Sequence, residues 1–276
     1  MRNRGKIDQF KSMLRRLKQG RGQGSGKDYL PWLTVQDGPS LGFLVRSRGW
    51  KTARVHHFMS KLEYSYFCLL EWAPTVVDIR EQYPLLPLER TLEIADRLRI
   101  KHPVHPRTKQ PIVMTTDFLV DIKTDEWIVN WARTVKPSEK LASARVIEKF
   151  EIERTYWSEQ GIDWGIVTER EIGKYGAMPM NVQSLHRAWH MNELPLQSIE
   201  QLHKIEEELF EKLSAHNLSP ARSAGMVDDQ LGLRPGCSLA ALKHFIARKL
   251  WGVDMTKKLD FCRQIFVKRT NKGREQ

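Results

Sequence analysis

The chain has few cysteines and no long apolar run. Its 276 residues include three cysteines, Cys68, Cys237 and Cys262, an odd number without any C-x-x-C spacing. This pattern argues against a disulfide framework and a cysteine zinc site, so all three are expected to be packing residues. No apolar segment approaches the roughly 20 residues that a membrane span needs, and the basic N-terminus lacks the apolar core of a secretory signal. We therefore expect a cytoplasmic protein without a membrane partner.

Motifs of several common enzyme classes are also missing. The sequence has no P-loop, no G-x-S-x-G and no G-x-G-x-x-G. It therefore lacks the phosphate-binding loop of NTPases, the nucleophile motif of α/β-hydrolases and the phosphate-binding motif of dinucleotide enzymes. No histidine has a partner at a metal-ligand spacing such as H-E-x-x-H. His56, His57, His102 and His105 are therefore expected at the surface or beside helices.

Positive charge is concentrated at the two ends of the chain. Residues 1–28 carry nine Lys and Arg against two Asp, and residues 243–276 carry ten against three acidic residues, whereas the part between them has a net charge of −2. Clustered cations suit a polyanion such as DNA, because binding of Lys and Arg to phosphates releases counterions. Solubilising tails are the alternative explanation.

Length and patterning indicate about two domains behind a basic arm. We interpret residues 1–50 as this N-terminal arm, in which "KDYLPWLTVQDG" is expected to lie on a surface without regular structure. A helix at 60–72, three strands, a helix at about 138–160 and one more strand predict an α/β domain over 51–173, a mixed sheet with helices on its faces. Three helical patterns followed by an alternating segment predict a mostly helical, winged-helix-like domain over 174–276.

Two strands of the predicted sheet carry charged residues at unusual places. In "MTTDFLVDIKTDEWIVNWARTVKP", antiparallel pairing through the intervening turn would put Asp117 opposite Thr134 and hence near Lys136. A carboxylate and an ammonium at one sheet edge, with a second carboxylate from a helix, suit metal-dependent phosphodiester hydrolysis. Glu63 is the best helical carboxylate for this role, and Glu153 is the next.

Structural explanations of the same residues stay open at this point. Asp117 and Lys136 would also make a partly buried ion pair, and Glu63 forms a possible capping box with Ser60. Asp121, on the same face of its strand, is an alternative to Asp117. The spacing alone is too short and degenerate to decide between a nuclease and a structural role.

Several longer segments closely resemble one protein family. These are "GRGQGSGKDYLPWLTVQ", "ARVHHFMSKLEYSYF", "VVDIREQYPLLPL", "IKHPV", "MTTDFLVD", "TVKP" and "EKFEIERTYW". In order and spacing they resemble the TnsA endonuclease subunit of heteromeric cut-and-paste transposases, strongly over residues 20–170 and weakly beyond. The resemblance implies a restriction-endonuclease-like catalytic domain of the P-D-(D/E)-x-K superfamily, followed by a winged-helix-like domain.

The resemblance also implies roles for individual residues. Glu63 and Asp117 match the metal-binding carboxylates, and Lys136 matches the lysine that positions water or neutralises charge. The position two before the lysine, acidic in restriction enzymes and often Gln in this family, is Thr134 here. The expected ligands of Mg²⁺, or of Mn²⁺ in its place, are therefore Glu63, Asp117, the backbone carbonyl of Val135 and, as a further ligand or as support, Glu153.

For function, the resemblance implies cleavage of the 5′ (non-transferred) strands at the transposon ends, so that the element is excised by cut-and-paste. The implied partners are transposon-end DNA, a DDE-class transposase subunit (TnsB) that acts on the 3′ ends, and an AAA+ ATPase regulator (TnsC) bound through the C-terminal domain. The expected location is the bacterial cytoplasm, on DNA. A catalytically silent DNA- or ATPase-binding adaptor, motivated by Thr134, is the main alternative, and a stand-alone restriction or repair nuclease is a third.

Overall fold

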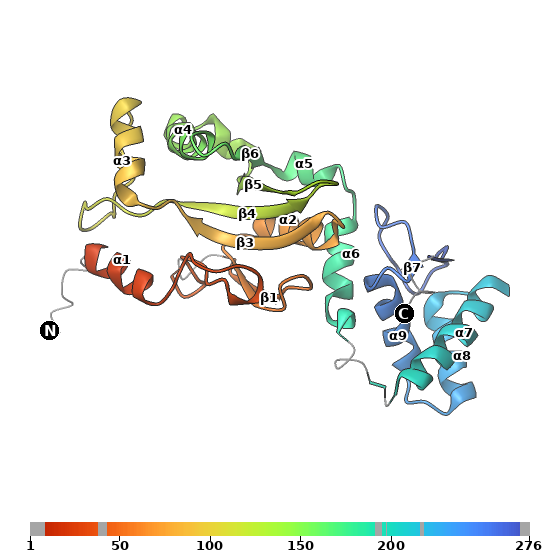
Figure 1. Ribbon diagram of the computed structural model, residues 1–276. Helices are drawn as coiled ribbons and strands as arrows, with labels where there is room; N and C mark the ends of the chain where they lie inside the picture. The colour runs from red at the N-terminus through yellow and green to blue at the C-terminus, as the bar shows by residue number, and fades with distance from the viewer. Residues whose placement is uncertain (1–8, 38–42, 191–194, 197, 216–217, 271–276) are drawn as a thin grey trace, which may run out of the picture. The chain divides into compact units, whose positions relative to one another are not determined.

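The structure, a computed structural model, consists of two compact units (Figure 1). The first unit is Met1–Lys174 and the second is Tyr175–Gln276. In the described part of the chain, no helix is both long and apolar enough to cross a membrane. The residues that the structure describes are 9–37, 43–190, 195–196, 198–215 and 218–270.

A four-stranded mixed sheet forms the centre of the first unit. Its strands lie in the order β3 (Val76–Pro84), β4 (Thr115–Lys123), β5 (Ile128–Val135) and β6 (Asp163–Val167). The first three pair antiparallel, whereas β6 runs parallel to β5, because helix α4 (Ala144–Ser158) crosses over between them. This mixed sheet with flanking helices confirms the predicted fold class.

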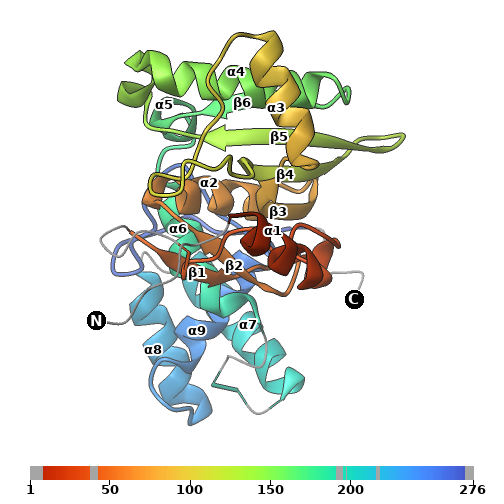
Figure 2. The same cartoon turned by 90° about the vertical axis from the view of Figure 1, so that its left-hand side faces the viewer.

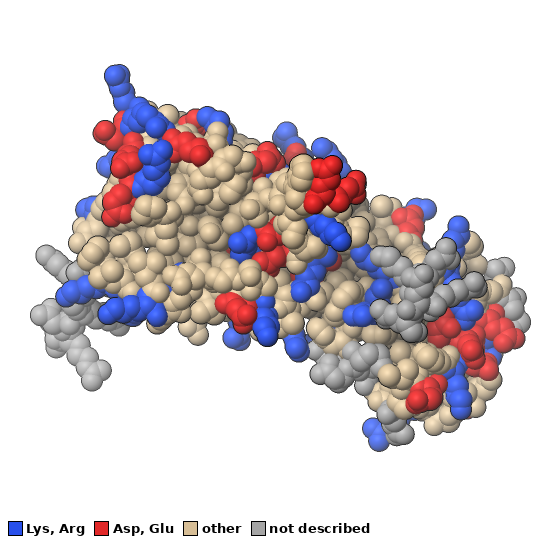
Figure 3. All heavy atoms as spheres, in the orientation of Figure 1, with Lys and Arg blue, Asp and Glu red and all other residues tan. Residues whose placement is uncertain are grey.

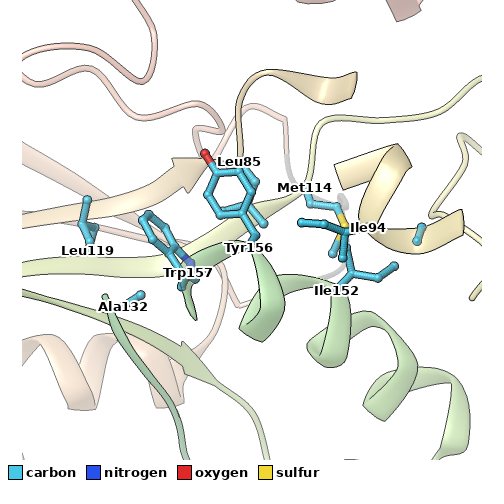
Figure 4. Packing of buried hydrophobic residues seen from close by; sticks show 9 residues of the cluster. Leu85, Ile94, Met114, Leu119, Ala132, Ile152, Tyr156 and Trp157 are labelled. Atoms are coloured by element: carbon cyan, nitrogen blue, oxygen red, sulfur yellow. The ribbon is translucent and has the colours of Figure 1, made fainter. Parts of the chain in front are cut away.

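A hydrophobic core joins this sheet to helices α3 (Leu88–Arg97) and α4 (Figure 4). Within it, Trp157 is 1% exposed and its Nε1–H donates to the hydroxyl of Thr116 on β4 at 2.6 Å. The one polar atom of this buried indole is therefore satisfied. The cluster consists of Leu85, Ile94, Ala95, Met114, Leu119, Ala132, Ile152, Tyr156 and Trp157.

Helix α2 (Lys61–Trp72) and a β-hairpin belong to the first unit (Figure 2). Aromatic side chains fix both to the sheet. The hairpin consists of β1 (Val45–Arg48) and β2 (Val55–Phe58). Phe58 of β2, Phe67 of α2 and Phe118 of β4 are fully buried. The ring centroid of Phe58 lies 4.6 Å from that of Phe67 and 6.2 Å from that of Phe118. These contacts hold the start of α2 against β4.

A buried ion cluster lies under the hairpin. Glu81 of β3 is 1% exposed and accepts hydrogen bonds from the Arg54 guanidinium, from His56 Nδ1 at 2.7 Å and from the His57 N–H at 3.1 Å. Burial would raise the pKa of Glu81, but the charges and hydrogen bonds of His56 and Arg54 hold it well below its ordinary value. Glu81 is therefore a carboxylate that ties the hairpin to the sheet.

The histidines were expected at the surface or beside helices, and His56 is fully buried beside α2, with its ring centroid 4.6 Å from that of Phe67. Its Nδ1 contacts Glu81, and its Nε2 contacts the Thr52 hydroxyl at 2.7 Å. His102 is buried too, with the Thr91 hydroxyl 3.0 Å from its Nε2. Among the cysteines, two are buried as expected, whereas Cys262 is exposed.

A second buried carboxylate, Glu71 of α2, makes stability depend on pH. It is 3% exposed, and its Oε2 accepts from the N–H groups of Trp50 at 2.8 Å and Lys51 at 3.2 Å. Burial raises its pKa from 4.5 to about 7. The folded protein therefore binds more protons than the unfolded chain, so this contribution to stability is present below about pH 4.5 and is lost as pH rises through about 7.

We expect Glu71→Gln, which keeps an acceptor oxygen without the charge, to remove this dependence. Relative to the wild type, its free energy of unfolding should rise by roughly 2–3 kcal/mol between about pH 5 and pH 8.5, since one pKa unit corresponds to about 1.4 kcal/mol. Urea denaturation of both proteins at the two pH values measures this difference. A difference that does not change with pH would assign the dependence to other groups.

The N-terminal segment predicted as an arm contains helix α1 (Gln9–Lys18) and contacts β3. Parts of it, residues 1–8 and 38–42, lie outside the described residues. No further helix or strand occurs between α1 and residue 37 apart from one 3₁₀ turn, η1 (Gly26–Asp28). Three hydrogen bonds join the segment to β3: Gly26 N–H to Asp78 Oδ2 at 3.0 Å, Tyr29 Oη to the Glu81 carbonyl at 3.1 Å, and Trp32 N–H to the Gln82 carbonyl at 3.2 Å.

Several elements of the first unit were not predicted from the sequence. The expected long helix begins with a 3₁₀ turn, η2 (Ser138–Ala142), and only then becomes α4. Helix α3, "LERTLEIADR", was not predicted, although half of its residues are apolar or small and three of them are buried on one face. The strands of the hairpin were not predicted because four residues give little periodicity. A five-residue helix, α5 (Glu169–Gly173), completes the unit.

The second unit is mostly helical, as predicted. Helix α8 was not predicted, since its buried face is made of small residues such as Ala224. The alternating segment after the last helix forms strands of only two residues each, and the basic tail 271–276 lies outside the described residues. The elements are α6 (Met178–Leu185), η3 (His186–Trp189), α7 (Ile199–Ala215), α8 (Pro220–Leu231), α9 (Cys237–Ala247), β7 (Trp251–Gly252) and β8 (Lys268–Arg269).

Candidate active site

Glu63 lies in the first turn of α2, where the residues before the helix hold its carboxylate. Oε2 accepts from the Met59 N–H at 2.9 Å and Oε1 accepts from the Ser60 hydroxyl at 2.9 Å. The Ser60 hydroxyl in turn accepts from the Glu63 N–H at 3.1 Å, and Glu63 is 6% exposed. The capping role that the sequence left open is therefore present. The capping contacts leave the Glu63 carboxylate able to bind a further partner, because each of its oxygens has a second lone pair.

Asp117 lies on β4 beside the end of β5. The register of these strands, in which Phe118 pairs with Arg133, continues with Asp117 beside Thr134, as predicted. The Oδ2 atom of Asp117 accepts from the Val135 N–H at 2.7 Å. The carboxylate is thus held by the backbone of the neighbouring strand.

Asp121, the other carboxylate of this strand, is engaged elsewhere. Its Oδ1 accepts from the side chains of Arg80 on β3 and Asn130 on β5. These partners give Asp121 a structural role across three strands. Of the two aspartates, it is Asp117 that lies with Glu63.

Gln82 of β3 joins the two carboxylates, and the sequence analysis missed it. Its Nε2 donates to Glu63 Oε2 at 3.5 Å and to Asp117 Oδ1 at 3.4 Å, and its Oε1 accepts from the Thr115 hydroxyl at 3.4 Å. Gln82 is 3% exposed. Its backbone φ is +49°, in the left-handed region that residues other than glycine seldom adopt. A buried amide in this conformation links the carboxylates of Glu63 and Asp117.

Lys136 follows β5 directly and is half-buried. Its N–H donates to the Val167 carbonyl on β6 at 2.9 Å, which fixes its backbone. Its charge lowers the pKa of both Glu63 and Asp117. Asp117 accepts the N–H of Val135, the residue directly before Lys136. Of the three predicted catalytic residues, the structure joins Glu63 and Asp117 through Gln82 and places Lys136 next to the strand residue that Asp117 contacts.

Glu63 and Asp117 also destabilise each other as anions. Burial, and second the charge of Asp117, raise the pKa of Glu63 to about 8. Burial likewise raises the pKa of Asp117, against the hydrogen bond from Val135 and the charge of Lys136. A divalent cation between two such carboxylates would remove their repulsion. Their hard oxygen donors fit Mg²⁺, which commonly uses one or two carboxylates and completes its shell with water and substrate phosphate.

Glu153 of α4 lies beside these residues and supports them through Thr134. Its Oε1 accepts from the hydroxyl of Thr134, from the hydroxyl of Thr116 at 2.7 Å and from Trp164 Nε1 at 3.0 Å. Burial raises its pKa to about 7. Among the described residues, no three His, Cys, Asp or Glu side chains are placed to hold one metal ion. The direct ligand role of Glu153 stays a prediction, although Thr134 brings its carboxylate to the place that is acidic in restriction enzymes.

Two family models and a curated relative match the chain. Residues 73–169 match the TnsA-like endonuclease N-terminal model, and residues 177–255 match the TnsA endonuclease C-terminal model. The transposon Tn7 transposition protein TnsA of Escherichia coli is 52% identical over 158 residues. The chain belongs to the TnsA endonuclease family. The alignment covers 57% of this chain and 56% of that relative, so the chain spans little more than half of the relative's length.

The site residues of this TnsA-family chain come from separate parts of the sequence. Asp117, Lys136 and Glu153 fall inside the region that matches the N-terminal model, whereas Glu63 precedes it. Gln82 belongs to "VVDIREQYPLLPL", one of the segments that carry the TnsA resemblance. That segment supported the family resemblance, but it did not indicate a role for Gln82. The contacts of Gln82 are with residues of α2 and β4, which lie elsewhere in the sequence.

Proposed function

We propose that the chain is the metal-dependent DNA endonuclease subunit of a transposase, cutting the 5′ (non-transferred) strands at transposon ends so that the element is excised by cut-and-paste. The observation that carries this proposal is that the Gln82 amide joins Glu63 and Asp117, while Asp117 accepts the N–H of Val135, the residue directly before Lys136. Membership of the TnsA endonuclease family supports it.

Each residue of the site has a distinct task in this proposal. Glu63 and Asp117, with the carbonyl of Val135, hold Mg²⁺, for which Mn²⁺ can substitute. The bound ion supplies polarisation of the scissile phosphate and a water of lowered pKa. Lys136 neutralises charge that develops on the phosphate or orients the attacking water. Gln82 keeps the two carboxylates at a fixed separation through its two N–H groups.

The proposed partners follow from the family. They are transposon-end DNA, a DDE-class transposase (TnsB) that cuts and joins the 3′ ends, and an AAA+ ATPase (TnsC) that contacts the C-terminal unit. The match of residues 177–255 to the TnsA C-terminal model supports the last assignment. The proposed location is the bacterial cytoplasm, on DNA.

Strand-resolved cleavage tests the proposal. A plasmid carrying both transposon ends is incubated with Mg²⁺, the partner transposase and either the wild type or Lys136→Ala. We expect the variant to lose 5′-strand cutting at least about a hundredfold, the scale of removing one group that stabilises transition-state charge. Lys140→Ala is the matched control, because Lys140 is exposed and its ion pair is with the neighbouring Glu139 at 3.6 Å.

The other outcomes decide between the alternatives. Equal 5′ cutting by wild type and Lys136→Ala would overturn the catalytic assignment and favour the silent adaptor, which Thr134 in place of an acidic residue suggests. Substantial cutting by the purified chain without its partners would favour a stand-alone nuclease.

A further inference from the structure

The segment that leads into α2 is basic and has no acidic residue. Between positions 38 and 62 the sequence contains five Lys and Arg, two His and no Asp or Glu. Two of these cations are used within the protein, since Arg54 pairs with Glu81 and Lys51 Nζ donates to the Ala73 carbonyl at 2.8 Å. The remaining three, Arg46, Arg48 and Lys61, are exposed.

Strand alternation puts two arginines on one outward face of the hairpin. Arg46 and Arg48 are exposed, whereas Ser47 between them is buried. Arg46 pairs with His57 and Arg48 with the exposed Val55, and these four residues are called the hairpin face. Neither arginine forms a salt bridge with a residue that the structure describes. Their charges are therefore available to an external anion.

A hollow beside the hairpin face extends the basic surface. It has a volume of about 440 Å³ and lies between the N-terminal segment and β2, with Arg21, Lys27 and Arg54 in its lining. Arg21 pairs with Asp37 and Arg54 with Glu81, but Lys27 is exposed and makes no salt bridge within the described residues. In Figure 3, Lys and Arg gather along the edge of the first unit near the position of β1 in Figure 1, although acidic atoms lie among them.

The hairpin face adjoins the candidate metal site along the chain. Strand β2 ends at Phe58, and the next residue, Met59, donates its N–H to Glu63. Since a strand rises about 3.3 Å per residue, the Arg46–His57 pair lies roughly 7 Å from Met59 along the strand direction. A phosphate bound by Arg46 would thus lie within a few nucleotides of one bound at the metal site.

We propose that Arg46 and Arg48, together with the exposed Lys27 and Lys61, bind backbone phosphates of the duplex that is cut at the site. Guanidinium groups match phosphate oxygens in a bidentate manner, and such contacts set the register of a protein on DNA without reading its sequence. The proposal rests on the proposed function for the identity of the anion as transposon-end DNA.

Equilibrium binding without divalent metal tests the surface apart from cutting. Full-length wild type and R46Q/R48Q are titrated with a fluorescent transposon-end duplex in EDTA at several salt concentrations. We expect roughly tenfold weaker binding of the variant near 0.1 M salt, and a slope of log K against log salt that is shallower by about two, one for each phosphate contact. The control K123Q/K149Q removes the same charge from the end of β4 and from α4, where both lysines are exposed, and should keep the wild-type slope.

Each other result has a defined meaning. Unchanged affinity and slope in R46Q/R48Q, with a circular dichroism spectrum like that of the wild type, would overturn the DNA contact. So would unchanged DNA binding together with weaker capture of the partner transposase or ATPase, which would make the face a protein interface. If the slope of log K against log salt became shallower by the same amount in R46Q/R48Q and in K123Q/K149Q, the effect would come from net charge and not from the hairpin face. Failure of the wild type to cut 5′ strands with its partners would overturn the proposed function alone, because the titration needs no cleavage.

Discussion

Asp117→Asn is expected to abolish cutting of the 5′ strands while joining of the 3′ strands by the partner transposase continues. The amide oxygen of Asn can still accept from the Val135 N–H, which Asp117 Oδ2 accepts at 2.7 Å, so the strands should stay paired. What is lost is the negative charge that is proposed to bind the metal. We expect a loss of at least about a thousandfold, or ~4 kcal/mol of transition-state stabilisation. Strand-resolved cleavage with Mg²⁺ and the partner transposase measures it.

Asp121→Asn provides the matched control, because it changes the same group on the same strand. Asp121 is engaged by Arg80 and Asn130, so this variant should cut at close to the wild-type rate. Binding of Mn²⁺ to the DNA-free proteins, followed by electron paramagnetic resonance, should weaken in Asp117→Asn and not in Asp121→Asn. The reverse pattern would move the metal site to Asp121. With 5′ cutting lost, cointegrates should replace simple insertions.

Glu81→Gln is expected to cost about 3–5 kcal/mol of the free energy of unfolding, the scale of breaking a buried ion pair by removing one partner. The substitution would leave the guanidinium of Arg54 buried without its counter-charge, and it would weaken the bond to His56 Nδ1. A neutral amide cannot offset the cost of desolvating Arg54. Chemical denaturation at neutral pH, with the same slope fitted for both proteins, gives the difference.

Glu93→Gln serves as the control for this prediction. Glu93 pairs with Arg90 on the surface of α3, where its side chain is 64% exposed, and exposed pairs contribute at most about 1 kcal/mol. The two substitutions remove the same charge, so only burial separates them. A cost for Glu81→Gln close to that for Glu93→Gln would mean that the cluster relaxes to admit water.

Much of the catalytic set could be predicted because it depends on local rules. A turn between two alternating strands fixes their register, and the register brings Asp117 beside Thr134 and close to Lys136. The cap formed by Ser60 marks the start of α2 and so the position of Glu63. These inferences need only strand periodicity and helix capping.

Gln82 could not be predicted by such rules. Its contacts depend on a left-handed backbone conformation and on residues from α2 and β4 that lie 19 and 35 positions away in sequence. The complete burial of His56 could not be predicted for a related reason, since its partner Glu81 is 25 positions away. Polar residues whose partners come from other elements carry no periodic signal.

The two missed helices differ from each other. Helix α3 has five charged residues among its ten, yet it buries Thr91, Ile94 and Ala95 on one face at helical spacing, so its pattern was present and was not used. Helix α8 buries small residues such as Ala224, which give a weaker apolar pattern. The alternating segment after Trp251 was expected to form a short hairpin, and its strands β7 and β8 do pair antiparallel, although each has only two residues.

The N-terminal segment forms hydrogen bonds with Asp78, Glu81 and Gln82 of β3. The sheet that carries the candidate active site therefore depends on residues far ahead of it in the sequence. A fragment cut at Ala73, where the match to the N-terminal family model begins, would lack Glu63 and the hairpin. One cut just before α2 would keep Glu63 but leave Glu81 without Arg54 and the Gln82 carbonyl without its donor. A fragment that keeps the candidate active site and its supports therefore needs the N-terminal segment from Gly26 onward as well as the sheet.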